Sequence, residues 1–398
     1  MRRCENVRAP VSASSKHAPV KTYFSRSATL AALIMTAWNV GAVAAAESVG
    51  PHNREEAQKI MAEMRRIVSP EGVERLEKVR IGGIDQWLSI RGVDKRNPVL
   101  LYLHGGPGYS VMASSWYFSR GWEEYFTVVH WDQRGAGKTY VTNDPEKIRP
   151  TMTRERMVKD TEEVIAWLRR EFGKDRIFVL GHSWGSYLGI EMARRHPDWL
   201  HAYIGMGQVT NAPESERRGW RYAMEHAQRG KDQAAIRDLQ SIAPYAADGK
   251  PLTLKEIMIQ RKYLNLYGGY VYHRVDSAHE GEAAKLAPEF TDDDVRNLWT
   301  ADDFAEGILL PEVLTLDFTP LKTLKCPTIL FVGRYDYDVS ASAAAEWFEH
   351  LQAPSKKIVW FERSGHMMHT EEPGKVLISL VEFARPFAER AGDIEPAK

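Results

Sequence analysis

Cysteine is nearly absent from this chain, and so is any excess of charge. Only Cys4 and Cys326 occur among 398 residues, which excludes a disulfide-rich scaffold and a zinc site built from thiolates. The 53 Lys and Arg residues balance the 53 Asp and Glu residues, so no basic field attracts nucleic acid and no acidic tail is present. Internal repeats and low-complexity tracts are also missing. The composition, with 43% apolar and 27% charged residues, is that of an ordinary globular protein.

The first 46 residues differ from the rest of the chain. A head with six Lys or Arg residues and one acid precedes an apolar stretch that ends in small residues of the A-x-A kind. This order predicts a secretory signal peptide, cleaved near Ala44 to Ala46, and therefore an exported protein, periplasmic or secreted, without stable membrane association. The alternative is an uncleaved membrane anchor over residues 28–46, which are nearly long enough to span a bilayer.

Strand and helix patterns alternate along most of the remaining chain. A helical lead-in covers residues 47–72, and apolar runs typical of strands buried on both faces of a parallel sheet follow over residues 73–209. The alternation stops over residues 210–317, resumes over 318–390 with a last helix from Pro373 to about Arg390, and leaves a frayed tail at 391–398. The pattern predicts an α/β fold with a mostly parallel central sheet flanked by helices. The interruption predicts an inserted helical cap domain over the carboxyl ends of the strands, where such sheets bind ligands.

The stretch LGHSWGS places a serine between two glycines. Gly181 and Gly185 flank Ser183 directly after an apolar strand and before a helix. This context suits a strained turn that lifts the serine hydroxyl clear of the backbone, and the helix N-terminus behind it favours a developing negative charge. Ser183 is therefore the candidate nucleophile. The alternative is a glycine-rich turn with a capping serine.

A serine nucleophile needs a base and a group that orients the base. The acid and then the histidine are expected to follow the serine in the chain. The stretch FVGRYDYDVS offers Asp336 and Asp338, and WFERSGHMMH offers His366 and His369. We select Asp336 as the first acid past the strand end. We select His366 because Gly365 frees its loop to project back over the strand ends, and Asp338 and His369 remain the alternatives.

The glycine loop in LYLHGGPGYS fits a backbone binding site. Attack by Ser183 would create an oxyanion that needs two N–H donors. The residue after the nucleophile, Trp184, is expected to supply one donor, and Gly105 or Gly106 the other. The sequence leaves open which glycine does so. His104 is expected to brace this loop rather than to react.

Taken in order, the stretches HGGPG, WDQRGAGKT, GHSWG, GRYD and SGH resemble the proline iminopeptidase branch of the α/β-hydrolase superfamily. The resemblance covers about residues 73–209 and 318–390. It implies an α/β-hydrolase fold in which Ser183, Asp336 and His366 form the triad. Neither a metal ion nor an organic cofactor is implied.

The sequence departs from this family in two places. His182 stands where the family usually has glycine before the nucleophile, and we expect it simply to pack at the turn. The region from residue 210 to 317 lacks the family's usual sequence. The resemblance implies carboxylates there that hold a substrate amine, and Glu214 and Glu216 are candidates, although acids on a helix usually form a solvated face.

In the DQRG stretch we expect Asp132 and Arg134 to form an ion pair that fixes the loop.

These expectations describe an exported serine hydrolase that works through an acyl-enzyme. The resemblance implies an aminopeptidase that releases an N-terminal residue, proline above all, from short peptides. One alternative is a carboxylesterase or lactonase acting on a small ester with the same triad. A second is a non-catalytic protein that keeps the fold and binds a ligand. In each case the partner is a small molecule or a short peptide and not a nucleic acid.

Overall fold

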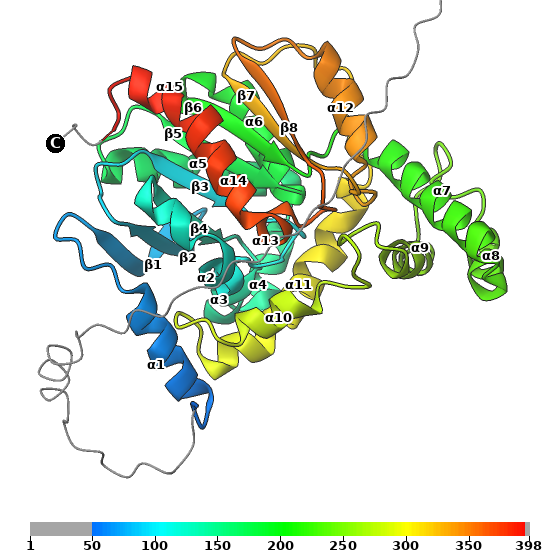
Figure 1. The fold of residues 1–398 in the computed structure, drawn as a ribbon, viewed down its shortest axis with the longest axis horizontal. Coiled ribbons are helices and arrows are strands. Elements are labelled where there is room, and N and C mark those ends of the chain that lie inside the picture. Colours follow the sequence, from blue (N-terminus) through cyan, green and yellow to red (C-terminus); the bar gives the residue numbers. More distant parts are fainter. Residues whose placement is uncertain (1–49, 395–398) are drawn as a thin grey trace, which may run out of the picture. The chain divides into compact units, whose positions relative to one another are not determined.

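Eight strands form one mixed sheet in the computed structural model of this chain, which describes residues 50–394 (Figure 1). The strand order is β1-β2-β4-β3-β5-β6-β7-β8. The pairs β1–β2 and β2–β4 are antiparallel, and all other neighbours are parallel. The strands are β1 (Val73–Ile81), β2 (Ile84–Gly92), β3 (Val99–Leu103), β4 (Thr127–Asp132), β5 (Ile177–His182), β6 (Leu200–Met206), β7 (Thr328–Gly333) and β8 (Lys356–Phe361). The predicted mostly parallel sheet is confirmed.

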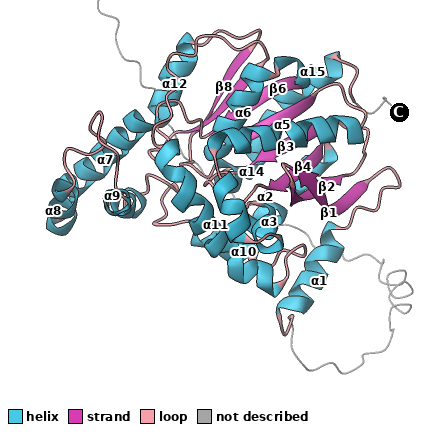
Figure 2. Ribbon diagram, turned by 180° about the vertical axis from the view of Figure 1, so that it is seen from behind, coloured by secondary structure: helices cyan, strands magenta, loops and turns pink. Residues whose placement is uncertain are grey.

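Helices lie on both faces of this sheet. Figure 1 shows α14 and α15 in front of it, and Figure 2, seen from behind, shows α5 in front of it. The α-helices outside the β6–β7 connection are α1 (Arg54–Arg65), α2 (Ser115–Phe118), α3 (Gly137–Thr142), α4 (Pro145–Ile148), α5 (Arg154–Glu171), α6 (Trp184–Arg195), α12 (Ala341–His350), α13 (Met368–Glu371), α14 (Pro373–Ser379) and α15 (Arg385–Arg390). Short 3₁₀ turns are η1 (Met112–Ser114), η2 (Arg120–Glu124), η3 (Arg149–Thr151) and η4 (Pro197–Trp199).

Alternate side chains of the central strands enter two different hydrophobic clusters. Leu101 and Leu103 of β3 pack with α5, α6 and α12 on one face of the sheet. Leu100 and Tyr102 pack with α2, α14 and α15 on the other face. Because both faces are covered, a central strand needs apolar side chains in both directions, which explains its continuous apolar run.

The C-terminal region differs from the expectation in two respects. The predicted last helix is divided into α14, a π-helical turn over Leu380–Ala384 and α15. Pro386 stands in the first turn of α15, and its missing N–H cannot continue the regular hydrogen-bond ladder. The residues after α15 are held to the core as far as they are described, because Asp393 accepts from His201 Nε2 at 2.8 Å and forms an ion pair with Lys174.

The connection from β6 to β7 holds five helices, all within the described residues. They are α7 (Ala212–Gly230), α8 (Gln233–Ser241), α9 (Leu254–Leu266), α10 (Ala278–Ala284) and α11 (Asp292–Val313), and together they are called the insert below. Helices α7, α8 and α9 share a small hydrophobic cluster of their own, whereas α11 packs against α3. Within residues 50–394, no helix is both long and apolar enough to cross a membrane. The predicted signal peptide or anchor lies outside the described residues.

Candidate active site

Ser183 occupies the sharp turn between β5 and α6. The strand ends one residue before it and the helix begins one residue after it. Its φ of 54° and ψ of −122° are strained for a residue with a side chain. A Cβ on Gly181 would lie 2.3 Å from the carbonyl oxygen of Gly185, and a Cβ on Gly185 would lie 2.0 Å from a carbonyl oxygen of β3. Both glycines are therefore needed for the turn to pack against the sheet.

His366 and Asp336 meet at the carboxyl ends of β7 and β8. His366 Nδ1 lies 2.8 Å from Asp336 Oδ2, and both side chains are buried. The other carboxylate oxygen of Asp336 accepts from the backbone N–H groups of Asp338 at 3.1 Å and Val339 at 2.9 Å, which fixes its orientation. Burial would lower the pKa of His366, but the charge of Asp336 and the hydrogen bond to it raise that pKa to about 9.

The two alternative residues occupy different positions. Asp338 approaches the opposite ring nitrogen, with its Oδ2 3.9 Å from His366 Nε2. His369 is fully buried with its ring 4.9 Å from that of His182, and burial holds the pKa of His369 well below its usual value. The structure therefore brings Asp336, and not Asp338, to the ring nitrogen that an orienting acid contacts in a catalytic triad.

The glycine loop after β3 lies directly against the serine. A Cβ on Gly105 would lie 3.0 Å from Ser183 Cβ. Gly105, Gly106 and Trp184 line the same cavity as Ser183 and His366. Among the described residues no hydrogen bond joins the side chains of Ser183 and His366. The geometry brings together the serine, the histidine and two backbone segments of the type that stabilise an oxyanion.

Gln133 joins the two sides of this cavity, and the sequence analysis did not single it out. Its Oε1 accepts from Trp184 Nε1 at 3.0 Å, and its Nε2 donates to the carbonyl oxygen of His104 at 3.1 Å. Its backbone N–H donates to His104 Nε2 at 3.2 Å. Burial lowers the pKa of His104 to about 4, so the ring is a neutral acceptor. The sequence did contain a signal for Gln133, because this residue comes immediately after the buried strand β4, within the stretch WDQRGAGKT.

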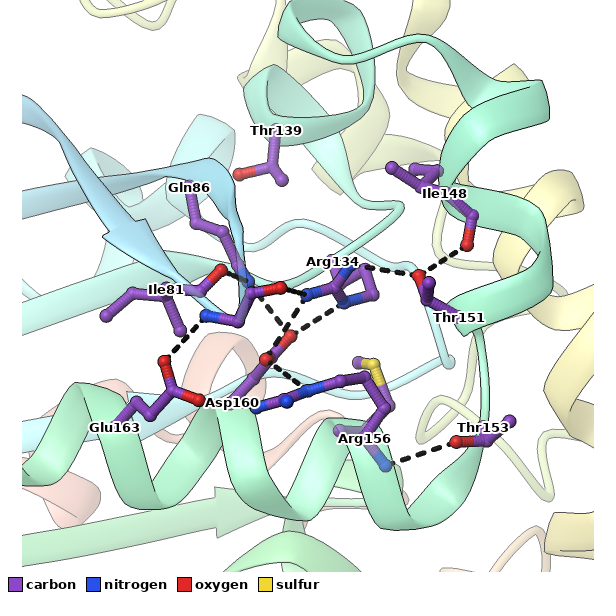
Figure 3. Close-up of polar contacts among 12 residues, drawn as sticks. Ile81, Gln86, Arg134, Thr139, Ile148, Thr151, Thr153, Arg156, Asp160 and Glu163 are labelled. Carbon is purple, nitrogen blue, oxygen red and sulfur yellow. Dashed lines mark hydrogen bonds and ion pairs between the residues drawn. The ribbon is translucent and has the colours of Figure 1, made fainter.

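The predicted pair between Asp132 and Arg134 is wrong. Arg134 Nε donates to Asp160 Oδ2 of α5 at 2.8 Å (Figure 3). Its Nη2 donates to the carbonyl oxygen of Gly82 at 2.8 Å. Asp132 instead accepts from the backbone N–H of Lys138 at 2.7 Å, in the first turn of α3. A carboxylate of α5 binds Arg134, and a backbone N–H of α3 binds Asp132, so neither residue pairs with the other. Both residues still fix the loop, but to different elements.

A cavity of about 270 Å³ lies over the serine. Its apolar lining comes from the strand ends and from the insert, and includes Val209, Ala212, Ile257, Leu310, Val313 and Val339. Its ionisable lining, besides His182, His366 and two tyrosines, comprises Glu216, Arg261, Asp302, Glu306 and Asp338. Four carboxyl groups thus face one arginine. Within the described chain, no three His, Cys, Asp or Glu side chains are placed to hold a metal ion.

The two carboxylates named from the sequence are both engaged by arginines. Glu214 does not line the cavity, and three arginines of its own helix contact it. Glu216 lines the cavity but accepts from Arg261 Nη1 at 3.1 Å and from Tyr245 Oη at 2.7 Å. The structure therefore gives Glu214 no access to a bound substrate, and Glu216 is already paired.

Asp302 and Glu306, one turn apart on α11, are the acids that the sequence analysis missed. Asp302 Oδ1 is buried without a hydrogen-bond partner in the described chain, and it lies 3.4 Å from the position of a Cβ on Gly106. Burial, with the charges of Glu306 and Asp303, raises the pKa of Asp302 to about 8. Burial also raises the pKa of Glu306. The available signal was the pair of acids at helical spacing, Asp302 and Glu306, in the stretch DDFAEGILL.

Comparison with known proteins gives consistent matches. Residues 98–373 match the family model described as alpha/beta hydrolase fold. A protein of Bacillus subtilis (strain 168), named probable aminopeptidase YbaC, is 33% identical over 318 residues, which are 78% of this chain and 96% of that protein. The proline iminopeptidase of Heyndrickxia coagulans is 25% identical over 290 residues, 72% of this chain and 90% of that protein. The crystal structure of the proline iminopeptidase of Mycobacterium smegmatis superposes with a TM-score of 0.57 at 20% identity, over 80% of this chain and 100% of that chain, and shows a shared fold.

Proposed function

This chain belongs to the α/β-hydrolase fold family, and we propose that it is a serine aminopeptidase that releases an N-terminal residue, such as proline, from short peptides. The similarity to proteins named as an aminopeptidase and as proline iminopeptidases supports this substrate class. The apolar lining of the cavity suits a small apolar side chain such as the proline ring.

The proposed reaction proceeds in two halves. Ser183 Oγ attacks the carbonyl carbon of the first residue while His366 Nε2 takes its proton, and Asp336 stabilises the imidazolium through Nδ1. The proton then passes to the departing peptide nitrogen, and the C–N bond breaks to leave an acyl ester on Ser183. A water molecule gives a proton to His366 and its oxygen to the acyl carbon, which restores the serine and releases the amino acid. The backbone N–H of Trp184 and that of Gly105 or Gly106 hold the oxyanion.

The observation that carries the proposal is the carboxyl oxygen of Asp302 beside Gly106, which has no hydrogen-bond partner in the part of the chain that the structure describes. If the substrate carbonyl oxygen occupies the glycine loop, the α-nitrogen of the same residue is only two covalent bonds from the carbonyl carbon. An ammonium there lies within reach of Asp302. An ionised Asp302 alone would oppose the growing oxyanion, whereas an ammonium bound to it neutralises that charge. The enzyme would therefore be selective for substrates with a free N-terminus, because only these carry an ammonium group that can pair with Asp302.

A carboxylesterase acting on a small ester is the second candidate. It is favoured by the pKa of Asp302, which burial raises to about 8, because a neutral carboxyl group at pH 7 tolerates an uncharged substrate. Such an enzyme would use the same serine, histidine and acid. The two functions differ only in whether the acids of α11 bind a cation.

Hydrolysis of three chromogenic compounds tests the proposal: prolyl p-nitroanilide, its N-acetylated form, and p-nitrophenyl acetate. The aminopeptidase proposal expects turnover of the free amine, loss of turnover when the nitrogen is acetylated, and no turnover of any compound by Ser183→Ala. Turnover of the ester alone would favour the carboxylesterase. Activity retained by Ser183→Ala would overturn the serine mechanism in both forms.

Export is a separate proposal that depends only on the pattern of residues 1–46. The intact mass of the protein recovered after expression tests it. A new N-terminus near Glu47 would support the signal peptide, and an unprocessed chain held in the membrane would support the anchor.

A further inference from the structure

The imidazole of His366 stands between two carboxylates. Asp336 Oδ2 is 2.8 Å from Nδ1, and Asp338 Oδ2 is 3.9 Å from Nε2. In the proposed mechanism Nε2 must accept the proton of Ser183. A carboxylate that closes on Nε2 would hold the imidazole in its protonated form and compete with the serine for that nitrogen. The exact position of Asp338 therefore decides whether the base is available.

Asp338 is held by an arginine of the insert. Arg261 Nε, on α9, lies 2.9 Å from Asp338 Oδ1. The same guanidinium contacts Glu216 through Nη1 at 3.1 Å, and Tyr245 Oη donates to Glu216 at 2.7 Å. Glu216 and Tyr245 are both buried. Charge-assisted hydrogen bonds between buried groups fix orientation strongly, so Tyr245, Glu216 and Arg261 form a continuous polar chain that ends at Asp338.

We propose that Arg261 is a positioning residue that restrains Asp338 and thereby keeps Nε2 of His366 open to Ser183. The inference rests on the proposed serine mechanism. Through Arg261, the insert would help to set the protonation state of His366, in addition to enclosing the substrate. The bond to Arg261 uses one carboxylate oxygen of Asp338, and the other oxygen is held 3.9 Å from His366 Nε2, beyond hydrogen-bonding distance.

The other titratable groups around His366 are either neutral or held by other hydrogen-bond partners, so they do not compete with Ser183 for Nε2 as Asp338 would. The ring of His182 is 4.7 Å from that of His366, and burial lowers the pKa of His182 to about 3, so it is neutral. The ring of Tyr270 is 5.3 Å away, and burial raises its phenol pKa, so it is neutral too. Glu371 is held by backbone N–H groups. Glu280 accepts from two hydroxyl groups, and burial raises its pKa to about 7.

The test replaces Arg261 with methionine, which removes the charge and keeps an unbranched side chain. Freed from Arg261, Asp338 should close from 3.9 Å to hydrogen-bonding distance of Nε2. This should move the acid limb of the kcat/KM–pH profile upward by about one unit, because a hydrogen bond to the charged imidazolium adds to the attraction that the carboxylate already exerts. At a pH on that limb, kcat/KM should fall about tenfold. The double variant Arg261→Met with Asp338→Asn should restore the limb. Arg217→Met, on α7 and away from the cavity, is the matched control.

A second readout separates this inference from the proposed function. Proton NMR of the hydrogen-bonded Nδ1 proton of His366 reports the pKa of the imidazole without any turnover, so it remains decisive if no peptide or ester is hydrolysed. The expected order of pKa values is Arg261→Met above the unaltered chain, with Asp338→Asn below it. An unshifted pKa in Arg261→Met, or a loss of activity that Asp338→Asn does not reverse, would overturn the inference. If Arg261→Met does not fold, Asp338→Asn alone decides, because an unchanged pKa there is incompatible with the inference.

Discussion

Replacement of Asp302 by asparagine isolates the charge that we propose to bind the substrate amine. The two side chains have nearly the same size, and the substitution leaves α11 otherwise unchanged. An ammonium paired with a buried carboxylate typically loses about 2–4 kcal/mol when the carboxylate is removed. That loss corresponds to a decrease of about 30- to 1000-fold in kcat/KM for a substrate with a free N-terminus.

The decrease in kcat/KM expected for Asp302→Asn depends on pH, and the pKa of Asp302 determines whether it grows or shrinks as the pH rises. Burial raises that pKa to about 8, so the carboxyl group is mostly protonated at pH 7 before substrate binds. Ionising it at pH 7 costs about 1.4 kcal/mol, and the ammonium must offset this cost. KM for the amine substrate should therefore decrease as the pH rises from 6 toward 8, and Asp302→Asn should abolish this dependence.

The assay compares prolyl p-nitroanilide with p-nitrophenyl acetate on Asp302→Asn and on the control Asp303→Asn. Asp303 is the exposed neighbour of Asp302 on the same helix, so it shares the local change in charge without facing the cavity. Ester hydrolysis should stay within a few-fold in both variants. Equal losses on the amide and the ester, or equal losses in the two variants, would refute the assignment of the amine to Asp302.

Three further predictions concern the base, its acid and the loop below them. Because the charge of Asp336 overcomes burial and raises the pKa of His366 to about 9, kcat/KM should increase with pH through the neutral range as the imidazole loses its proton; a flat profile would contradict this. Asp336→Asn should lower kcat by about 10³- to 10⁴-fold and Asp338→Asn by much less, and the reverse order would exchange their roles. Asp160→Asn breaks the buried pair with Arg134 and should lower the free energy of unfolding by about 3–5 kcal/mol in urea titrations; a loss below about 1 kcal/mol would show that the pair is dispensable.

The sheet and the turn at Ser183 could be predicted from the sequence because their signals are local. A strand buried on both faces must be continuously apolar, and a turn packed against its own sheet must have glycine at Gly181 and Gly185. The break in the last helix was equally local, since Pro386 stands inside the predicted helix and lacks the N–H that would continue its hydrogen-bond ladder.

The partners of charged residues could not be predicted, because they depend on contacts between distant segments. Arg134 pairs with Asp160 on α5, and Glu216 on α7 pairs with Arg261 on α9. In the sequence, Asp302 looks like any acid on a solvated helix. Only the folded chain shows that its oxygen is buried beside Gly106 and has no hydrogen-bond partner among residues 50–394.

The order of the strands has a consequence for the synthesis of the protein. The serine follows β5, whereas the acid and the histidine follow β7 and β8, which pair at the far edge of the sheet and come last in the chain. A ribosome that has completed the insert has therefore made Ser183 and most of the cavity lining, but neither Asp336 nor His366. Under the proposed mechanism, the growing polypeptide has no hydrolytic activity until its last two strands have docked, so the cell that makes it is not exposed to that activity during synthesis of the earlier parts.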